Sequence, residues 1–305
     1  MDKVAIVFPG QGAQYTGMGR ELAEVSPAAA EVFRQADAIR PGTSDQCFHG
    51  SEALLRETRV TQPCMLAVEL AAAAALKERD VIPDAAAGFS LGEISALTFV
   101  GAVDFSEGFR LVCRRGELMQ EAAQSVSTAM CAVVRLDNET VERLCGSFDG
   151  VYPVNYNCPG QVAVAGLAEA MPAFSAAVKA AGGRAIPLKV SGGFHSPFME
   201  GASVQFRKEL EDISFRQPEI PLYANATGLP YAGDYETLLA KQICSPVRWE
   251  SIVRHMLASG IDTFVEAGPG NTLSGVISKI DKQARTFCVS DADSLMGAVQ
   301  EVGKC

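Results

Sequence analysis

The motif Gly88-Phe-Ser-Leu-Gly92 sets the strongest limit on how this chain can fold. A short apolar run, residues 84–88, precedes the serine, and residues 93–100 have a helical pattern. This order is typical of a nucleophile elbow, a tight turn from a strand into a helix. Glycines on both sides allow the two elements to approach closely, so Ser90 can adopt strained backbone angles that expose its hydroxyl. A structural turn with an idle serine is the alternative explanation.

The segments on either side of this motif alternate between strand and helix patterns. Strands are expected at 3–8, 81–88, 221–225, 263–266 and 285–289. Helices are expected at 18–25, 28–39, 51–57, 64–78, 93–100, 104–124, 199–210, 234–242, 249–258 and 272–280. The alternation predicts an α/β fold, with a large α/β-hydrolase-like domain built on a parallel sheet from residues 1–126 and 192–305. The loop at 9–14 lacks the third glycine of a dinucleotide-binding turn, because Tyr15 takes that place.

A second pattern occupies residues 127–191. Its elements follow the order β-α-β-β-α-β, with strands at 130–136, 151–157, 161–165 and 184–190 and helices at 138–145 and 169–181. That order is typical of a ferredoxin-like unit, which is complete in itself. We therefore expect a small ferredoxin-like subdomain inserted into the large domain.

Composition limits the classes of function. With 48% hydrophobic residues among 305, the chain can bury a large core. Its formal net charge is −10, and binding phosphates requires clustered Lys and Arg, so a nucleic-acid partner is not expected. No apolar stretch reaches the ~18 residues of a membrane helix, since Glu69 interrupts even the alanine-rich segment 67–76. We expect no membrane partner and no signal segment, and the cytoplasm is the default location.

The nine cysteines predict neither a disulfide framework nor a metal site. They are odd in number and scattered, and the sequence has no Cys-x-x-Cys pair and no Cys/His cluster. Several, such as Cys64 and Cys131, lie in apolar runs where cysteine behaves as a small hydrophobic side chain. We expect no metal and no other cofactor.

A serine nucleophile needs a base, and the sequence offers three histidines. His195 lies in the loop Ser191-Gly-Gly-Phe-His-Ser-Pro197, where the inserted unit returns to the large domain. His49 falls in a predicted loop and His255 in a predicted amphipathic helix, so both have simpler structural explanations. His195 is therefore the candidate base. No acidic residue in a comparable motif follows, so a backbone carbonyl is expected to orient the imidazole in place of the usual carboxylate.

Two neighbouring arginines, Arg114 and Arg115, lie on the predicted helix 104–124. Neighbours on a helix point about 100° apart, so at most one of them is expected to point into a given site. Taken alone, each favours a surface position.

Six segments, taken together and in this order, resemble one protein family. They are Phe8-Pro-Gly-Gln-Gly-Ala-Gln14, Gly88-Phe-Ser-Leu-Gly-Glu93, Arg115-Gly116, Asn155-Tyr-Asn-Cys-Pro-Gly-Gln161, Gly193-Phe-His-Ser-Pro197 and Glu266-Ala-Gly-Pro-Gly270. The chain resembles the malonyl-CoA:acyl carrier protein transacylases over nearly its whole length. The resemblance implies an acyltransferase of fatty-acid or polyketide synthesis that moves malonyl to the phosphopantetheine thiol of an acyl carrier protein.

The resemblance also implies a role for each matching residue. Ser90 would be the nucleophile, and His195 the general base and acid. The amides of Gln11 and Leu91 would form the oxyanion hole. Arg115 would pair with the free carboxylate of the malonyl group, for which a planar guanidinium is better suited than an ammonium. The remaining substrate-binding residues implied in this way are Gln62, Asn157 and Phe194.

Two positions depart from the family pattern, and a third bears on specificity. Phe89 stands where the family usually has His, which removes a polar contact from the pocket and leaves the elbow intact. Arg248 stands before Trp249 where relatives often have Gln; if the backbone carbonyl there orients the imidazole, the change of side chain is tolerable. The bulky ring of Phe194 resembles that of malonyl-selective relatives and favours malonyl over methylmalonyl.

The implied mechanism is ping-pong: a coenzyme A thioester malonylates Ser90, and a carrier-protein thiol then takes the group. The alternatives are an acyltransferase of a polyketide or malonate pathway, a Ser-His hydrolase of acyl thioesters, and a non-catalytic docking module. Arg115 argues against the hydrolase, because a charged guanidinium in an acyl pocket is costly without a carboxylate partner. Carrier proteins of this kind are acidic, so a local basic surface is expected, with Lys189, Arg207, Lys208 and Arg248 as candidates.

Overall fold

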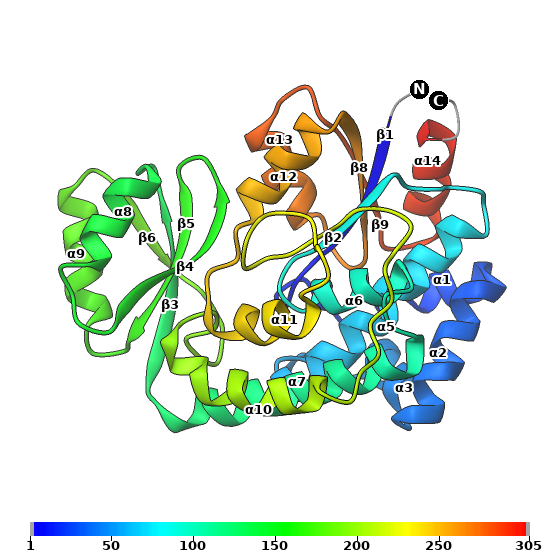
Figure 1. Cartoon of the computed structure of the whole chain (residues 1–305), viewed down its shortest axis with the longest axis horizontal. Helices are drawn as coiled ribbons and strands as arrows, with labels where there is room; N and C mark the ends of the chain where they lie inside the picture. The colour runs from blue at the N-terminus through cyan, green and yellow to red at the C-terminus, as the bar shows by residue number, and fades with distance from the viewer. Residues whose placement is uncertain (1–2, 303–305) are drawn as a thin grey trace.

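Two sheets organise residues 3–302, the part of the chain that the computed structural model describes (Figure 1). The first sheet is parallel, with the strand order β7-β2-β1-β8-β9. Its strands are β1 (Lys3–Phe8), β2 (Ala85–Gly88), β7 (Leu222–Tyr223), β8 (Ile261–Ala267) and β9 (Arg285–Val289). The pairing of β1 with β2 and β8 brings together segments from both ends of the chain. The parallel sheet predicted from the sequence is thus confirmed.

Helices cover both faces of this sheet. Before the second sheet they are α1 (Arg20–Val25), α2 (Pro27–Ile39), α3 (Thr43–His49), α4 (Glu52–Leu55), α5 (Thr58–Lys77), α6 (Gly92–Phe99) and α7 (Phe105–Ser125). After it they are the 3₁₀ turn Pro197–Met199, then α10 (Glu200–Leu210), α11 (Tyr235–Cys244), α12 (Trp249–Ala258), α13 (Thr272–Ile280) and α14 (Ala292–Val302).

Strand β1 divides the core of the large domain. Its side chains alternate in direction: Val4, Ile6 and Phe8 pack into the cluster formed with α2, α5 and α7, whereas Ala5 and Val7 pack with α12 and α13. A strand covered on both faces is apolar at every position, which explains why residues 4–8 show no polar alternation.

The second sheet is antiparallel, with the strand order β4-β5-β3-β6, and lies at one end of the molecule (green in Figure 1). Its elements are β3 (Thr128–Val134), α8 (Asn138–Cys145), β4 (Val151–Cys158), β5 (Gln161–Leu167), α9 (Met171–Ala180) and β6 (Arg184–Pro187). Helices α8 and α9 cover one face through Val141, Phe174 and Val178. The predicted β-α-β-β-α-β order and ferredoxin-like arrangement are confirmed, while the domain limits at 127 and 191 stay a prediction.

Several predicted boundaries were wrong. Helix α5 begins at Thr58 and not at the expected 64, and contains Pro63. The Thr61 hydroxyl donates to the carbonyls of Leu55 and Glu57, so hydrogen bonds to the segment just before it hold a first turn without apolar periodicity. The expected loop around His49 is helix α3, which buries too few side chains to show a pattern.

Two further elements differ from expectation. Strand β2 begins at Ala85 and not at 81, because Pro83 has no N–H to donate to a ladder. Helix α14 was not expected, since Gly297 at its middle weakens the helical pattern.

Helix α5 corrects the expectation about apolar stretches. Among residues 3–302 it is the helix long and apolar enough to cross a membrane by length and composition, and 89% of the tested stretch is buried inside the protein. The core helix of a globular protein passes the same test, and this burial favours that explanation. Glu69, which interrupts the stretch in the sequence, is itself fully buried.

The cysteines of the described range are free, and they are mostly buried. Cys305 lies outside the described residues. Within residues 3–302, no group of three or more His, Cys, Asp or Glu side chains is placed to hold a metal ion.

Candidate active site

The turn at Ser90 has the tight geometry that the sequence predicts. A Cβ added to Gly88 would lie 1.8 Å from the carbonyl oxygen of Gly92, and one added to Gly92 would lie 2.4 Å from that of Phe8. Ser90 itself has φ = 56°, in the left-handed region that favours glycine. Asn225 fixes the turn: its Oδ1 accepts from the Ser90 amide at 2.7 Å, and its Nδ2 donates to the Gly88 carbonyl at 2.6 Å.

His195 is the partner of the serine. Its Nε2 lies 2.7 Å from Ser90 Oγ, and its Nδ1 lies 2.8 Å from the backbone carbonyl oxygen of Gln242. A carbonyl can only accept, so Nδ1 carries the proton and Nε2 is free to accept from the hydroxyl. A backbone carbonyl therefore orients the imidazole as expected, but it belongs to Gln242. The condition stated for Arg248 is therefore not met, because its carbonyl is not the one that orients the imidazole; its guanidinium lies over the Tyr156 ring.

The surroundings keep His195 neutral. Burial, followed by the positive charge of Arg115, lowers the pKa of its imidazole to about 3, while the hydrogen bond to Gln242 acts in the opposite direction. The side chain is 3% exposed, so solvent does not offset these effects. At neutral pH the ring is therefore neutral, and its Nε2 can take a proton from Ser90.

Arg115 reaches the nucleophile from α7. Its Nη2 donates to Ser90 Oγ at 3.2 Å and to Gln242 Oε1 at 2.7 Å, and its Nη1 donates to Gln62 Oε1 at 2.8 Å. The guanidinium is 1% exposed, and its Nε has no hydrogen-bond partner among the described residues. Burial lowers the pKa of Arg115 to about 10, so it stays charged at neutral pH. A buried cation with spare donors is suited to an anionic ligand group.

Arg114, the neighbouring arginine, points away from the site. It is an exposed side chain that pairs with Glu117 and Glu209. The helix geometry predicted that at most one of the two arginines would enter a site, and the structure confirms this.

Gln242, on α11, connects the other groups and was not predicted. Its Nε2 donates to the Ser90 carbonyl at 2.7 Å and to Glu93 Oε2 at 2.8 Å. Its Oε1 accepts from Arg115, and its backbone carbonyl accepts from His195. Nothing in the sequence of α11 distinguishes this glutamine. Glu93, by contrast, follows the elbow motif on a helix that is otherwise uncharged and mostly buried, and a carboxylate there could have been noticed as buried.

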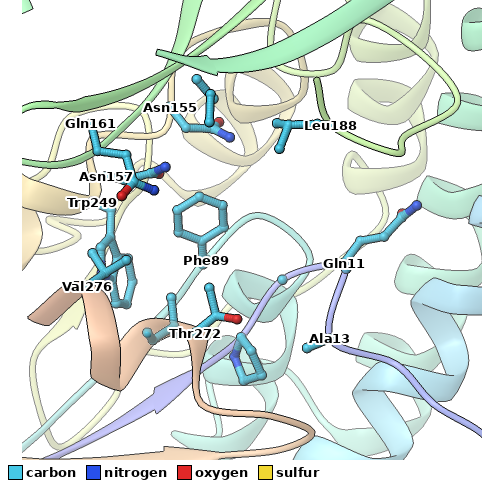
Figure 2. A pocket seen from close by; sticks show the side chains of 16 residues that line it. Gln11, Ala13, Phe89, Asn155, Asn157, Gln161, Leu188, Trp249, Thr272 and Val276 are labelled. Atoms are coloured by element: carbon cyan, nitrogen blue, oxygen red, sulfur yellow. The ribbon is translucent and has the colours of Figure 1, made fainter. Parts of the chain in front are cut away.

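A cavity of about 290 Å³ opens beside Ser90 and His195. The residues predicted from the sequence that line it are Gln11, Gln62, Ser90, Leu91, Phe194 and His195. Asn157 is not brought to this cavity. It lines an adjoining cavity of about 260 Å³ together with Phe89 and Trp249 (Figure 2).

The adjoining cavity lies between the two sheets. Figure 2 shows Asn155 and Asn157 of β4 on one side of the Phe89 ring and Gln11 on another. Asn155, which was not predicted, lines both cavities. The Oδ1 atoms of Asn155 and Asn157 are buried and have no hydrogen-bond partner among residues 3–302. Buried polar atoms are normally paired, so these two are suited to accept N–H donors from a bound molecule.

Comparison with known proteins identifies the family. Residues 5–296 match the family model of the acyl transferase domain. The chain belongs to the acyl transferase family. It is similar to the malonyl CoA-acyl carrier protein transacylase of Bacillus subtilis, with 37% identity over 308 residues that cover 98% of this chain and 97% of that one. The family resemblance drawn from the sequence motifs is thus confirmed.

Solved structures of this family have the same fold. The malonyl CoA-acyl carrier protein transacylase of Clostridium perfringens superposes with a TM-score of 0.96 at 35% identity, covering 99% of this chain and 98% of that one. A malonyl-transacylase solved in complex with its type II polyketide acyl-carrier protein gives 0.94 at 36% identity, covering 98% and 100%. These likenesses extend over both sheets.

Proposed function

We propose that this protein transfers malonyl from malonyl-CoA to the phosphopantetheine thiol of an acyl carrier protein in fatty-acid synthesis. The names of its full-length relatives support the activity. The observation that carries the proposal is the buried Arg115 guanidinium, 3.2 Å from the Ser90 hydroxyl oxygen. A cation at that distance would select an acyl group with its own carboxylate, as malonyl has.

The first half-reaction makes a malonyl ester on Ser90. The Ser90 proton passes to Nε2 of His195 as Oγ attacks the thioester carbonyl carbon. The amides of Gln11 and Leu91, residues that line the cavity, hold the oxyanion. The carbon–sulfur bond then breaks, and the imidazolium returns the proton to the leaving coenzyme A thiolate.

Arg115 and His195 are coupled through charge in this step. The positive charge of Arg115 is one of the causes that lower the pKa of His195. A malonyl carboxylate paired with Arg115 would offset that charge, so the imidazole becomes a stronger base when the correct substrate is bound. Acetyl thioesters, which lack the carboxylate, would not have this effect.

The second half-reaction reverses the first with a different thiol. The phosphopantetheine thiol gives its proton to His195 and attacks the malonyl ester, and Ser90 leaves with that proton. Asn155 and Asn157 would accept from amide N–H groups of a thiol arm that reaches the site through the adjoining cavity. All proton and acyl movements use residues of the chain and the two thiols, so the proposal includes no cofactor and no metal.

The partners in this proposal are a coenzyme A thioester and an acyl carrier protein, without nucleic acid or membrane, in the cytoplasm. Four exposed cations are candidates for docking an acidic carrier protein: Lys189, Arg207, Lys208 and Arg248. Reversing the charges of Arg207, Lys208 and Arg248 should slow transfer to the carrier protein at low salt and leave malonylation of Ser90 unchanged, whereas Lys189 also lines the cavity beside Ser90. We also propose 127–191 as a separate subdomain that forms one side of the adjoining cavity.

Acyl transfer from labelled malonyl-CoA and acetyl-CoA tests the proposal, with free acid counted separately. Wild type should transfer malonyl with little free acid, and Arg115→Ala should lose malonyl transfer. Arg114→Ala is the matched control, because that side chain is exposed and paired elsewhere. Release of mostly free acid, or a preference for acetyl, would instead favour the hydrolase. A polyketide carrier protein that accepted malonyl better than a fatty-acid carrier protein would favour a role in polyketide synthesis. The similar malonyl-transacylase solved with a type II polyketide acyl-carrier protein is the reason to include this acceptor.

A further inference from the structure

Two opposite charges are buried near the nucleophile without touching. Glu93 is 0% exposed and Arg115 is 1% exposed. Arg115 makes no ion pair with a carboxylate among the described residues, and its positive charge still acts on Glu93. The side-chain amide of Gln242 stands between them, 2.8 Å from Glu93 Oε2 and 2.7 Å from Arg115 Nη2. Glu93 therefore acts as the counterion of Arg115 indirectly, through the side-chain amide of Gln242.

The orientation of the Gln242 amide is fixed by its neighbours. Its Nε2 faces two acceptors, the Ser90 carbonyl and the Glu93 carboxylate, and its Oε1 faces the Arg115 donor. Rotating the amide by 180° would place oxygen against two acceptors and N–H against a guanidinium. The amide dipole thus points its positive end at Glu93 and its negative end at Arg115.

The other groups around Glu93 allow it to gain a proton. Its Oε1 accepts from the Tyr231 hydroxyl at 2.6 Å and from the backbone N–H of Asn225 at 3.1 Å. The Tyr231 hydroxyl can reverse and accept from a protonated Glu93, leaving Oε2 as acceptor for Gln242. Protonation therefore need not move Gln242.

Further titratable groups lie one contact away. His195 is bonded to the backbone of Gln242, Tyr235 stacks on Tyr231, and Glu69 of α5 accepts from Ser95 on the helix that carries Glu93. Burial is the largest cause acting on Glu93 and raises the pKa of its carboxyl to about 7. Four smaller causes lower this pKa: the hydrogen bonds from Tyr231, Gln242 and Asn225 and the positive charge of Arg115. The carboxyl is thus close to balance between its two protonation states at neutral pH.

We propose that Glu93 is the counterion of Arg115 in the empty site and takes up a proton from solvent when a substrate carboxylate binds Arg115. Two carboxylates sharing one buried cation repel each other, so arrival of the second favours the neutral form of the first. Glu93 is a positioning residue in this account, since it acts on the substrate through Gln242 and Arg115. The inference rests on the proposed function, because it needs a carboxylate on the acyl group.

Proton uptake during acylation tests this inference. Transfer from a thioester to Ser90 consumes no proton, because the serine proton ends on the coenzyme A thiol. Wild type is mixed with malonyl-CoA at pH 7 in a weak buffer that contains an indicator dye. It should take up about half a proton for each malonyl-enzyme formed, because a carboxyl with a pKa near 7 is about half ionised at this pH. Acetyl-CoA should cause no uptake. Mass spectrometry counts the acyl-enzyme in each case.

Two variants separate Glu93 from other buried carboxyls. Glu93→Gln should abolish the uptake in whatever malonyl-enzyme forms. Either orientation of the new amide places N–H against a donor, Gln242 Nε2 or the Asn225 amide, so slower acylation is also expected. Glu69→Gln is the matched control, an equally buried glutamate outside this network, and should retain the uptake.

The dependence of the wild-type uptake on pH keeps the test decisive if Glu93→Gln does not fold. Uptake by Glu93 should be small at pH 6 and rise toward pH 8, whereas uptake by His195 would be largest at pH 6. Three outcomes would overturn the inference and leave the proposed function standing: full formation of the malonyl-enzyme without proton uptake, proton uptake that does not change between pH 6 and 8, or equal proton uptake with malonyl-CoA and acetyl-CoA. Failure of wild type to form any malonyl-enzyme would overturn the proposed function itself.

Discussion

The two sides of the adjoining cavities differ in how their polar groups are satisfied. On the side of the parallel sheet, Ser90, His195 and Gln242 are hydrogen-bonded to one another or to Arg115, whose Nη1 and Nη2 are paired while its Nε has no partner among the described residues. We call these four residues the bonded side. On the side of the antiparallel sheet, Asn155 and Asn157 keep buried oxygens without a partner in the described part of the chain. We call these two the open side.

This difference separates two kinds of contribution to catalysis. Groups fixed by mutual hydrogen bonds are already placed before substrate arrives, which lowers the cost of reaching the transition state. Unpaired acceptors contribute only when a ligand donates to them, and they contribute equally to ground state and transition state. Changes on the bonded side should therefore lower kcat, and changes on the open side should raise KM.

The largest expected effect is loss of the nucleophile. Ser90→Ala cannot form the acyl-enzyme, so malonyl transfer should fall on the order of 10⁴-fold or more. Steady-state transfer and mass spectrometry of the acyl-enzyme measure this. Ser191→Ala is the control, because that serine contacts Thr58 and belongs to neither side. An acyl adduct that persisted in Ser90→Ala would move the chemistry to another residue.

The next largest effect tests the connecting role of Gln242. Gln242→Ala keeps the backbone carbonyl that orients His195 and removes the amide that holds Arg115 and the Ser90 carbonyl. We expect kcat/KM for malonyl-CoA to fall about 10- to 100-fold, from the loss of a hydrogen bond to a charged group. Gln35→Ala, at a glutamine whose side chain donates to Glu31 away from the site, should have no effect. Equal losses for malonyl and acetyl substrates would contradict the role of Gln242 in holding Arg115.

On the open side the expected effects are smaller and of another kind. Asn155→Ala and Asn157→Ala should each raise KM about fivefold with little change in kcat, which corresponds to about 1 kcal/mol for a neutral hydrogen bond. Initial rates with coenzyme A and pantetheine thioesters measure both parameters. Asn138→Ala, on α8 of the same subdomain, is the control. If kcat fell instead, the two sides would not differ as we describe.

The smallest expected effect is the absence of a titration. A lowered pKa of about 3 leaves His195 neutral from pH 5 to 7, so the rate at which a sulfonyl fluoride modifies Ser90 should show no acid limb in that range. An ordinary histidine would reduce the rate by half near pH 6.5. In Arg115→Ala one of the causes of the low pKa is removed, and the limb should move to higher pH. A half-point near pH 6.5 in wild type would contradict the burial argument.

The sequence predicted the residues whose position is set locally. The elbow places Ser90 through two glycines within two residues of it, comparison of the three histidines singled out His195, and the resemblance to the family identified Arg115. Gln242 and Asn225 could not be predicted, because they act from a helix and a loop more than 130 residues from Ser90. One of the contacts of Gln242 uses a backbone carbonyl, which any residue could supply, so its side-chain type carries no information about that role.

The fold was predictable for a similar reason. Strand β1 and the β-α-β-β-α-β segment follow from local patterns of apolar residues. The first turn of α5 could not be predicted from such a pattern, because hydrogen bonds from the Thr61 hydroxyl hold it. Helix α3 buries only Thr43 and Cys47, so its sequence resembles a loop.

The two reacting side chains share an unusual backbone conformation. Ser90 has φ = 56° and His195 has φ = 59°, and each costs on the order of 1 kcal/mol in a residue other than glycine. The surrounding structure opposes relaxation of these angles, through the Asn225 and Gln242 bonds at Ser90 and the Gln242 contact at His195. We therefore expect the reacting pair to separate early as packing loosens. Catalysis in this enzyme should fail at a lower temperature than the one at which its helices and sheets melt.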